Sequence, residues 1–393
     1  MATTPASPRI AIVGAGISGL ATAIALRLRG FHTVIFEAVP TLLPVGAGIL
    51  LQPNAMTVLS RLGLADAVER VGVPLERAGV WDANDLAGGP LQVIDMRAIA
   101  SRHGARTVAL LRSALQDILL GALDRPPQLD RRCVRIERAD TACPRLCFAN
   151  GAVEEADVII AADGIHSAVR ASAFPELRLR YSGQTSWRGL VDVDPSTEPE
   201  TAYEYWSGGF RVGFARVAPT VTYWFTALDA PEGGRGDPAD ELAMLRERCR
   251  VFPSPVVDLL ARTDPAAVVR NDLHDLMPPR DWSRGSIVLV GDAVHATTPN
   301  LGQGGAQALE DALALADAIA MHGAGPRAFA VYGRRRRAKA ARVVRASWWT
   351  GKIGHLRHPL GRRLRNTVMR RTPTSVVMRQ LDAIYTVAPT TTR

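Results

Sequence analysis

The spacing of three glycines near the N-terminus constrains the fold of this chain more than any other feature. Gly14, Gly16 and Gly19 lie between an apolar run and a stretch rich in helix formers. A second apolar run follows and ends at Glu37. This order predicts a buried strand, a tight turn, a helix and a second strand, which together form the unit that binds a dinucleotide.

Each residue type in this unit has a physical reason. Gly14 permits the tight turn, Gly16 lets a pyrophosphate approach the backbone, and Gly19 lets the helix pack close to the strand. The free N–H groups at the helix N-terminus attract phosphates, and Glu37 is placed to accept hydrogen bonds from ribose hydroxyls. The predicted cofactor-binding residues of this unit are Gly14, Ala15, Gly16, Ser18, Gly19, Glu37 and Ala38.

Two further acids follow apolar runs that read as buried strands. Asp163 and Gly164 come after the first run and precede a helix expected to start near Ser167. Asp292 comes after the second run and precedes the glycine-rich segment 302–305, which opens a long predicted helix. Asp292 is suited to bind a sugar-like chain, and the N–H groups of the glycine-rich segment can face an anion that develops on a ligand.

Length and charge set the outer bounds. The 393 residues suffice for two or three domains. The segment 327–393 has a net charge of +16 while the whole chain has +9, which leaves −7 for residues 1–326. The four cysteines are too few for a disulfide framework, and no metal site is expected. The short polar N-terminus and the absence of a long apolar run predict a cytoplasmic protein.

The region 178–228 is rich in aromatic residues and reads as an antiparallel sheet that walls a pocket. Arg188, Arg211 and Tyr223 are the candidate catalytic residues there. An arginine can hold a phenolate or carboxylate, and a tyrosine can hydrogen-bond a phenol. We expect Arg211 and Tyr223 to face one pocket. The alternative is that all three are strand residues that face solvent or pair locally.

Taken together, the three motifs resemble the single-component flavin-dependent aromatic hydroxylases, the para-hydroxybenzoate hydroxylase family. The resemblance rests on the Gly14–Glu37 unit, on Asp163-Gly164 with Arg170, and on Gly291-Asp292 with Pro299 and the 302–305 segment, in the family's order. It covers about residues 8 to 340. The Arg211 to Tyr223 spacing is similar to that of the FAD-dependent urate hydroxylase subgroup, from which Arg188 departs.

The resemblance implies FAD as cofactor and NADH or NADPH as co-substrate. It places Arg112 at the pyrophosphate and ribityl region, Asp163 at the pyrophosphate turn and Asp292 at the ribityl chain. It places Pro299 against the flavin ring, and Gly302, Gly304 and Gly305 at the N1–C2=O edge, which is anionic in the reduced flavin. The loop 45–48 matches the position where the flavin moves between its in and out states.

The implied fold is α/β, with a Rossmann-like FAD-binding domain, a substrate domain built on a mixed or antiparallel sheet, and a helical C-terminal tail. The expected FAD-binding domain comprises 1–75, 98–177 and 278–340. The substrate domain comprises 76–97 and 178–277, and the basic tail comprises 341–393.

The implied activity is a monooxygenase that uses NAD(P)H and O2 to hydroxylate a small aromatic or heteroaromatic molecule through a flavin C4a-hydroperoxide. Two alternatives are an epoxidase on the same scaffold and a flavin-binding ligand sensor without turnover. A monomer or a homodimer is expected.

The basic tail allows two interpretations. Its helices can pack on the body with a solvated basic face, or they can contact an anionic membrane or, less readily, nucleic acid. An apolar face is marked by Leu360, Leu364, Val368 and Met369.

Overall fold

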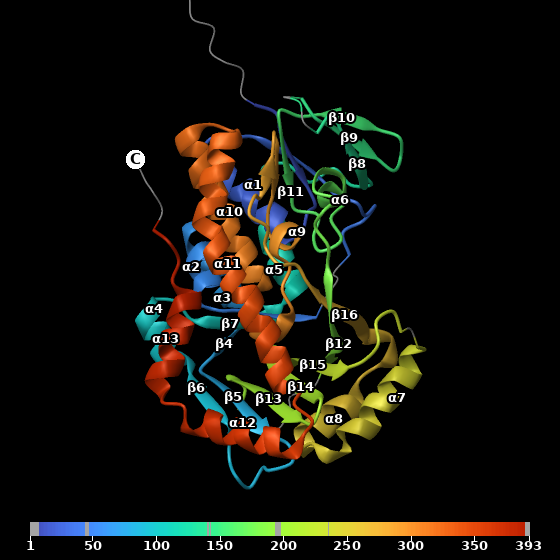
Figure 1. Ribbon diagram of the computed structural model, residues 1–393, viewed down its shortest axis with the longest axis vertical. Helices are drawn as coiled ribbons and strands as arrows, with labels where there is room; N and C mark the ends of the chain where they lie inside the picture. The colour runs from blue at the N-terminus through green and yellow to red at the C-terminus, as the bar shows by residue number, and fades with distance from the viewer. Residues whose placement is uncertain are drawn as a thin grey trace, which may run out of the picture.

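A computed structural model describes residues 8–43, 47–139, 141, 143–192, 198–234 and 236–389. Two large sheets organise it, one in the upper half of Figure 1 and one in the lower half. The upper sheet has the strand order β17-β18-β11-β1-β2. Its strands are parallel except the edge strand β17. Their bounds are β1 Ile10–Val13, β2 Thr33–Phe36, β11 Val158–Ala161, β17 Ser283–Arg284 and β18 Ile287–Leu289.

The lower sheet has the order β16-β12-β15-β14-β13-β5-β6. Its neighbours are antiparallel except the pair of β5 and β13, so the sheet is mixed. Its strands are β5 Arg77–Asp82, β6 Gln92–Asp95, β12 Arg180–Asp192, β13 Thr201–Ser207, β14 Phe210–Ala218, β15 Val221–Asp229 and β16 Val269–Asp275. Strands β5 and β6 pair antiparallel and form a hairpin.

Two smaller antiparallel sheets complete the β structure in the described residues. The order β3-β7-β4 joins the two halves, and β10-β9-β8 lies at the upper end (Figure 1). Their strands are β3 Gly48–Leu51, β4 Val73–Leu75, β7 Thr107–Leu111, β8 Cys133–Glu137, β9 Arg145–Phe148 and β10 Val153–Glu155.

Helices surround the upper sheet and run down beside the lower one (Figure 1). The 29-residue helix α11 passes along both halves, and α7 and α8 lie on the outer side of the lower sheet. The α-helices are α1 Ile17–Arg27, α2 Pro53–Arg61, α3 Ala65–Val71, α4 Met96–His103, α5 Arg112–Gly121, α6 Ala168–Ala173, α7 Pro238–Arg248, α8 Ser254–Arg262, α9 Asp292–His295, α10 Gly304–His322, α11 Pro326–Gly354, α12 Pro359–Arg371 and α13 Thr374–Tyr385. Short 3-10 helices occur at Cys249–Val251, Pro265–Ala267 and Pro299–Leu301.

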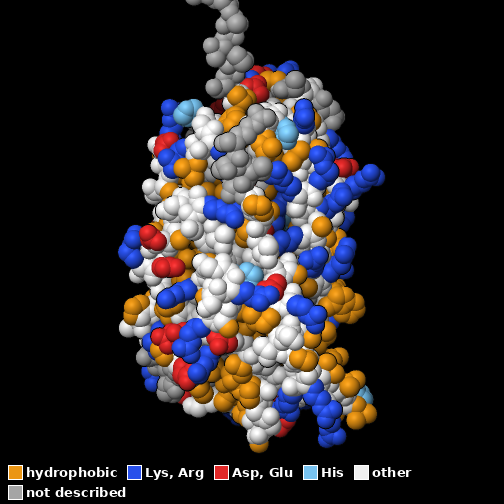
Figure 2. All heavy atoms as spheres, turned by 90° about the vertical axis from the view of Figure 1, so that its left-hand side faces the viewer, with side chains coloured by type: hydrophobic (Ala, Val, Ile, Leu, Met, Phe, Trp, Pro, Cys, Tyr) orange, Lys and Arg blue, Asp and Glu red, His pale blue; other side chains and the backbone are white. Residues whose placement is uncertain are grey.

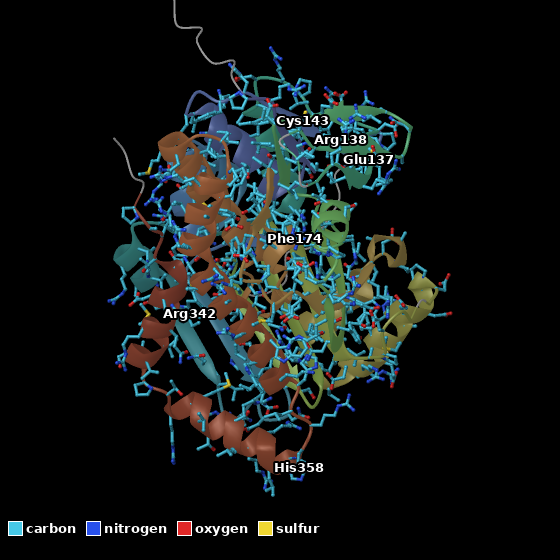
Figure 3. All side chains as sticks on the ribbon, turned by 45° about the horizontal axis from the view of Figure 1, so that its top comes forward. Glu137, Arg138, Cys143, Phe174, Arg342 and His358 are labelled. Atoms are coloured by element: carbon cyan, nitrogen blue, oxygen red, sulfur yellow. The ribbon has the colours of Figure 1, made fainter. Side chains whose placement is uncertain are left out.

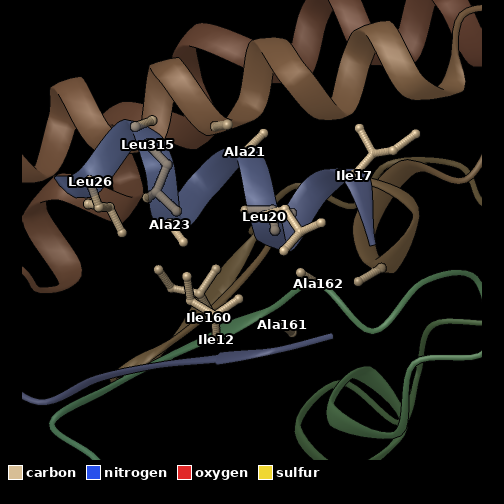
Figure 4. Close-up of a cluster of buried hydrophobic side chains, with 14 of the residues drawn as sticks. Ile12, Ile17, Leu20, Ala21, Ala23, Leu26, Ile160, Ala161, Ala162 and Leu315 are labelled. Carbon is tan, nitrogen blue, oxygen red and sulfur yellow. The ribbon is translucent and has the colours of Figure 1, made fainter. Parts of the chain in front are cut away.

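The main core lies where α1 is held between the upper sheet and α10 (Figure 4). Leu20 and Ala23 point toward Ile12 and Ile160 of the sheet, while Ala21 points toward α10. Because both faces of α1 are covered, almost the whole helix is apolar and buried. This packing fixes the helix N-terminus at the carboxyl edge of the sheet.

The predicted fold class, with its Rossmann-like part, mixed sheet and helical tail, is confirmed. The lower sheet takes strands from 77–95 and from 180–275, while the domain boundaries themselves stay a prediction. One detail of the tail differs from the sequence expectation. Arg362 and Arg365 face the body, where both bind Asp82, and so the basic face is not wholly solvated.

Candidate functional site

The three sequence motifs meet at one edge of the upper sheet. Val13, Ala161 and Leu289 are register neighbours at the carboxyl ends of three adjacent parallel strands. Ligands of open α/β sheets bind outside this edge. The glycine turn, Asp163 and Asp292 therefore lie in the position that such a ligand requires.

The glycine turn is shaped by close contacts that only glycine allows. Gly14 has a φ of +103°, and a Cβ placed on Gly19 would lie 1.9 Å from the carbonyl oxygen of Gly14. A Cβ on Gly16, in contrast, would meet no protein atom within 4 Å. Gly14 and Gly19 thus serve the packing of the protein, while the open space at Gly16 is available to a ligand.

Two polar side chains flank this turn, and they differ in their hydrogen bonds. The hydroxyl of Ser18 is buried and has no hydrogen-bond partner among the described residues. The carboxylate of Glu37 accepts hydrogen bonds from the N–H groups of Ala15, at 2.7 Å, and Val39, at 3.2 Å. Ala38 follows at the end of β2 and is half-buried. The unpartnered hydroxyl and the open space at Gly16 fit a phosphate group.

Asp163 and Arg170 tie the second motif to the third. Asp163 accepts hydrogen bonds from the Ser167 hydroxyl, at 2.5 Å, and from the Val169 N–H, at 3.1 Å. The buried Arg170 donates to the carbonyl oxygens of Ile165 and Ala293. Burial raises the pKa of Asp163, although its hydrogen bonds oppose that shift. These contacts hold the two strand ends in fixed relation.

Asp292 differs from Asp163 because no described residue hydrogen-bonds its carboxylate. Solvent reaches this side chain although protein surrounds it. Desolvation by those surroundings raises its pKa, while His295 and Arg112 act in the opposite direction. Arg112 opens α5, and its N–H donates to the carbonyl of Ala47 at 3.0 Å. An accessible, unpartnered carboxylate suits a ligand that carries hydroxyl groups.

The glycine-rich segment reaches this position as the N-terminus of α10. Pro299 is exposed, Gly302 has a φ of +62°, and α10 begins at Gly304 with Gly305 next. The first N–H groups of a 19-residue helix have no intrahelical partner and carry a partial positive charge. A Cβ on Gly304 would lie 3.9 Å from the Asp292 carboxylate. The N–H donors at the start of α10 and the carboxylate of Asp292 therefore lie in one site.

A buried polar network supports this segment from behind, and the sequence did not reveal it. Gln303 donates to Gln52 at 2.7 Å, and Asn54 donates to Gln303 at 3.0 Å and Glu310 at 2.7 Å. In the sequence, the only indication of this network is the position of Gln303 between Gly302 and Gly304. The network fixes the loop before α10 against α2.

A second cluster anchors the Gly291 turn to α10 and α11. Asp311 accepts hydrogen bonds from the Gly291 N–H, at 2.9 Å, from His295, at 2.5 Å, and from Arg336, at 2.7 Å. Burial alone would raise the pKa of Asp311, but His295 and Arg336 lower it to about 2. His295 is therefore engaged within the protein, as a structural group.

The three candidate catalytic residues lie on one face of the lower sheet. In the antiparallel pair of β12 and β15, Arg188 lies opposite Phe225, and Leu190 lies opposite Tyr223. Because the two pairs are two residues apart along each strand, their side chains share one face of the sheet. Tyr223 is also opposite Ala215, which is on the same face as Arg211. Strand alternation thus places all three side chains on the face opposite the Trp187 and Trp224 core.

These residues differ in what they bind. Arg211, 1% exposed, donates to Glu204 at 2.7 Å and to Asn300, next to Pro299, at 2.8 Å. Arg188 is half-buried. Within the described part of the chain it forms no ion pair, and its one hydrogen bond is a 3.5 Å contact with Ser186. Arg211 does not point to solvent, but its donors already have protein partners.

Tyr223 connects the lower sheet with the segment before α10. A Cβ on Gly48 of β3 would lie 2.6 Å from the Tyr223 ring, and a Cβ on Gly305 would lie 3.1 Å from Ile49. Burial raises the pKa of Tyr223, while the nearby charge of Arg188 lowers it. The predicted loop 45–48 lies outside the described residues at 45 and 46. Gly48, its last residue, contacts Tyr223.

At the carboxyl edge of the upper sheet, the structure brings together an open glycine turn, the unpartnered carboxylate of Asp292 and the N-terminus of α10. These features are typical of a protein that binds a flavin dinucleotide. The sequence matches the FAD binding domain family over residues 8–347, and the chain belongs to that family. It is a flavoprotein monooxygenase, as its relatives show. FAD is its cofactor, and the residues described above fit FAD.

Two sequence relatives and one solved structure support this assignment. The chain is 35% identical to the aurachin C monooxygenase/isomerase of Stigmatella aurantiaca, over 92% of this chain and 93% of that protein. It is 34% identical to the 2-heptyl-3-hydroxy-4(1H)-quinolone synthase of Pseudomonas aeruginosa, over 96% and 97%. The structure of Klebsiella pneumoniae HpxO complexed with FAD and uric acid is similar, with a TM-score of 0.88, 28% identity and 97% coverage of both chains.

Proposed function

We propose that this monooxygenase hydroxylates a nitrogen heterocycle that carries an acidic ring N–H or hydroxyl group, with NADH or NADPH as reductant. Arg188 carries the proposal, because it is half-buried beside Tyr223 and has no carboxylate partner among the described residues. An arginine in this setting favours an anionic ligand. Uric acid and a 4(1H)-quinolone, named for two relatives, are both nitrogen heterocycles with ring N–H and carbonyl groups.

The division of labour follows from these positions. The redox chemistry would come from bound FAD, which is reduced by NAD(P)H and activates O2 for transfer of one oxygen atom. Arg188 stabilises the deprotonated substrate, which makes the attacked ring carbon more electron-rich. Tyr223 stays a neutral phenol because burial raises its pKa, and its hydroxyl donates a hydrogen bond to the substrate anion. The residues around Asp292 and α10 would hold the ribityl chain and the N1–C2=O edge.

Arg211 has a different role in this proposal. Its hydrogen bond to Asn300 positions the short 3-10 helix that contains Pro299 and precedes the 302–305 segment. It then acts on the flavin edge through Asn300, while Arg188 contacts the substrate. NADH and NADPH are intracellular reductants, so we also propose a cytoplasmic location.

Arg188→Gln tests the assignment. Loss of a charge-assisted contact of about 1.5–3 kcal/mol should raise the substrate KM by about 10- to 150-fold or release peroxide, with FAD content unchanged. Arg188→Lys should recover part of the effect. The assay screens nitrogen heterocycles for stimulation of NAD(P)H oxidation and for a product heavier by one oxygen.

Arg135→Gln is the matched control, because the Arg135 side chain is 61% exposed on β8. If Arg188→Gln behaves like this control while Arg211→Gln raises KM with FAD retained, Arg211 holds the substrate instead. If no heterocycle stimulates NAD(P)H oxidation, the substrate class is wrong.

A further inference from the structure

Helix α12 presents its apolar side to solvent. Leu360, Leu364 and Val368 follow one another at four-residue spacing, and they are 65%, 67% and 56% exposed. The opposite side of the helix carries Arg365 and Asn366, which are buried. A surface helix of a globular protein ordinarily buries its apolar stripe and exposes its polar face. The orientation of α12 is the reverse.

Specific polar contacts impose this orientation. Asp82 of β5 accepts hydrogen bonds from Asn366, at 2.6 Å, and from Arg362, at 3.0 Å. Arg365 also reaches Asp82, at 3.4 Å, and lies 5.1 Å from the Trp206 ring. Since these contacts come from three positions on one side of the helix, they hold the apolar stripe outward.

Exposed apolar side chains also occur in the segment that precedes α12. Three more large apolar side chains, at the end of α11 and in the following turn, are exposed: Trp349 at 62%, Ile353 at 44% and Leu356 at 36%. Figure 1 places α12 at the lower end of the molecule, and Figure 3 shows His358, just before the helix, at the same end. Hydrophobic and basic side chains lie next to one another in that lower region of Figure 2.

Unpaired positive charge accompanies the stripe. Helix α12 contains five arginines and no acid. Arg363 and Arg371 are exposed and form no ion pair with any described residue. The whole segment 327–393 has a net charge of +16. Two copies of this surface would repel each other, so self-association through α12 is disfavoured.

We propose that α12 docks this enzyme on an anionic lipid membrane. A helix with an apolar stripe and basic flanks lies in the interface plane, with the stripe among the acyl chains and the arginines among anionic headgroups. Its 13 residues give it a length of about 20 Å. No described helix is long and apolar enough to cross a membrane. In this proposal the helix stays at the membrane surface, in the plane of the interface.

Co-sedimentation of the FAD-loaded enzyme with vesicles tests the proposal. Binding is expected to vesicles of phosphatidylcholine mixed with phosphatidylglycerol, to be weak with phosphatidylcholine alone, and to fall as salt rises. The double variant Leu360→Ser/Leu364→Ser should bind at least about tenfold more weakly, because two apolar side chains leave the interface. The double variant Arg363→Gln/Arg371→Gln should bind the anionic vesicles about tenfold more weakly, with its binding to phosphatidylcholine vesicles unchanged.

Val153→Ser is the control, since Val153 is 50% exposed on β10 at the other end of the molecule. All variants should retain FAD and thermal stability, because the substituted side chains are already in solvent. Equal sedimentation of the wild type with and without anionic vesicles would overturn the proposal. So would a dimer, seen by sedimentation velocity, that the Leu360→Ser/Leu364→Ser variant abolishes, because the stripe would then be a protein interface.

Discussion

Helices α1 and α12 are attached to the protein in opposite ways. Ten consecutive residues of α1, Ile17 to Leu26, are buried between the upper sheet and α10. Only Arg365 and Asn366 of α12 are buried, and both bind a single carboxylate. Apolar burial holds the first helix at every turn, whereas a few polar contacts hold the second. Helix α1 is thus part of the main core, whereas α12 contributes no side chain to it.

Polar contacts also join α11 to α10, and they are as deeply buried as the contact of Arg365 with Asp82. Arg336 of α11 donates to Glu310 at 2.5 Å and to Asp311 at 2.7 Å, and its side chain is 6% exposed. The same ionic chemistry therefore serves two purposes. Near the proposed cofactor site it supports the Gly291 turn and α10, and at the lower end of the molecule it orients a surface helix.

The largest effect is expected from Arg336→Leu. The substitution leaves Glu310 and Asp311 with less compensation for their burial, and breaking such a pair costs about 3–5 kcal/mol. Chemical denaturation should show this loss in the free energy of unfolding. Arg345→Leu on the same helix is the control, because Arg345 is exposed and should change stability by no more than about 0.5 kcal/mol. Equal effects for the two variants would mean that the buried cluster contributes little.

Two glycine variants separate packing from ligand binding within the α1 turn. Gly19→Ala should destabilise the protein by about 3 kcal/mol, since its Cβ would meet the Gly14 carbonyl at 1.9 Å. Gly16→Ala should leave the stability of the FAD-free protein unchanged and lower FAD occupancy, because the new methyl group meets only the space left for the pyrophosphate. Thermal unfolding and flavin absorbance distinguish the two. A Gly16→Ala protein that keeps all its FAD would remove Gly16 from the site.

The parts of the site that the sequence predicted depend on local rules. The glycine spacing determines the turn, and acids that follow parallel strands meet at one edge because those strands are neighbours. The supporting network was not predictable in this way. Asn54 and Glu310 are 256 positions apart, and no short-range pattern marks their contact.

The orientation of α12 could not be predicted from the sequence, because it depends on a contact with a distant part of the chain. The apolar stripe of Leu360, Leu364 and Val368 was visible, and the ordinary rule would bury it. What reverses the rule is Asp82, which lies on a strand 280 positions before Arg362. A single buried carboxylate can outweigh an apolar stripe only where its partners are placed on one face of the helix.

The smallest global effect is expected from Asp82→Asn, which tests how α12 is held. The Asp82 side chain is 1% exposed. Although burial alone would raise its pKa, hydrogen bonds from Asn366 and Asn84 and the charge of Arg362 lower it. A lowered pKa in the folded state means that this carboxylate stabilises the fold above its ordinary pKa of about 4, and that the contribution is lost as pH falls further.

Asp82→Asn should remove about 1–3 kcal/mol from the docking of α12 and leave the rest of the fold unchanged. Hydrogen exchange should then be faster in 359–371 at neutral pH, with α1 unaffected, and the wild type should show the same change only in acid. Faster exchange across α1 as well would mean that the two helices unfold as one cooperative unit.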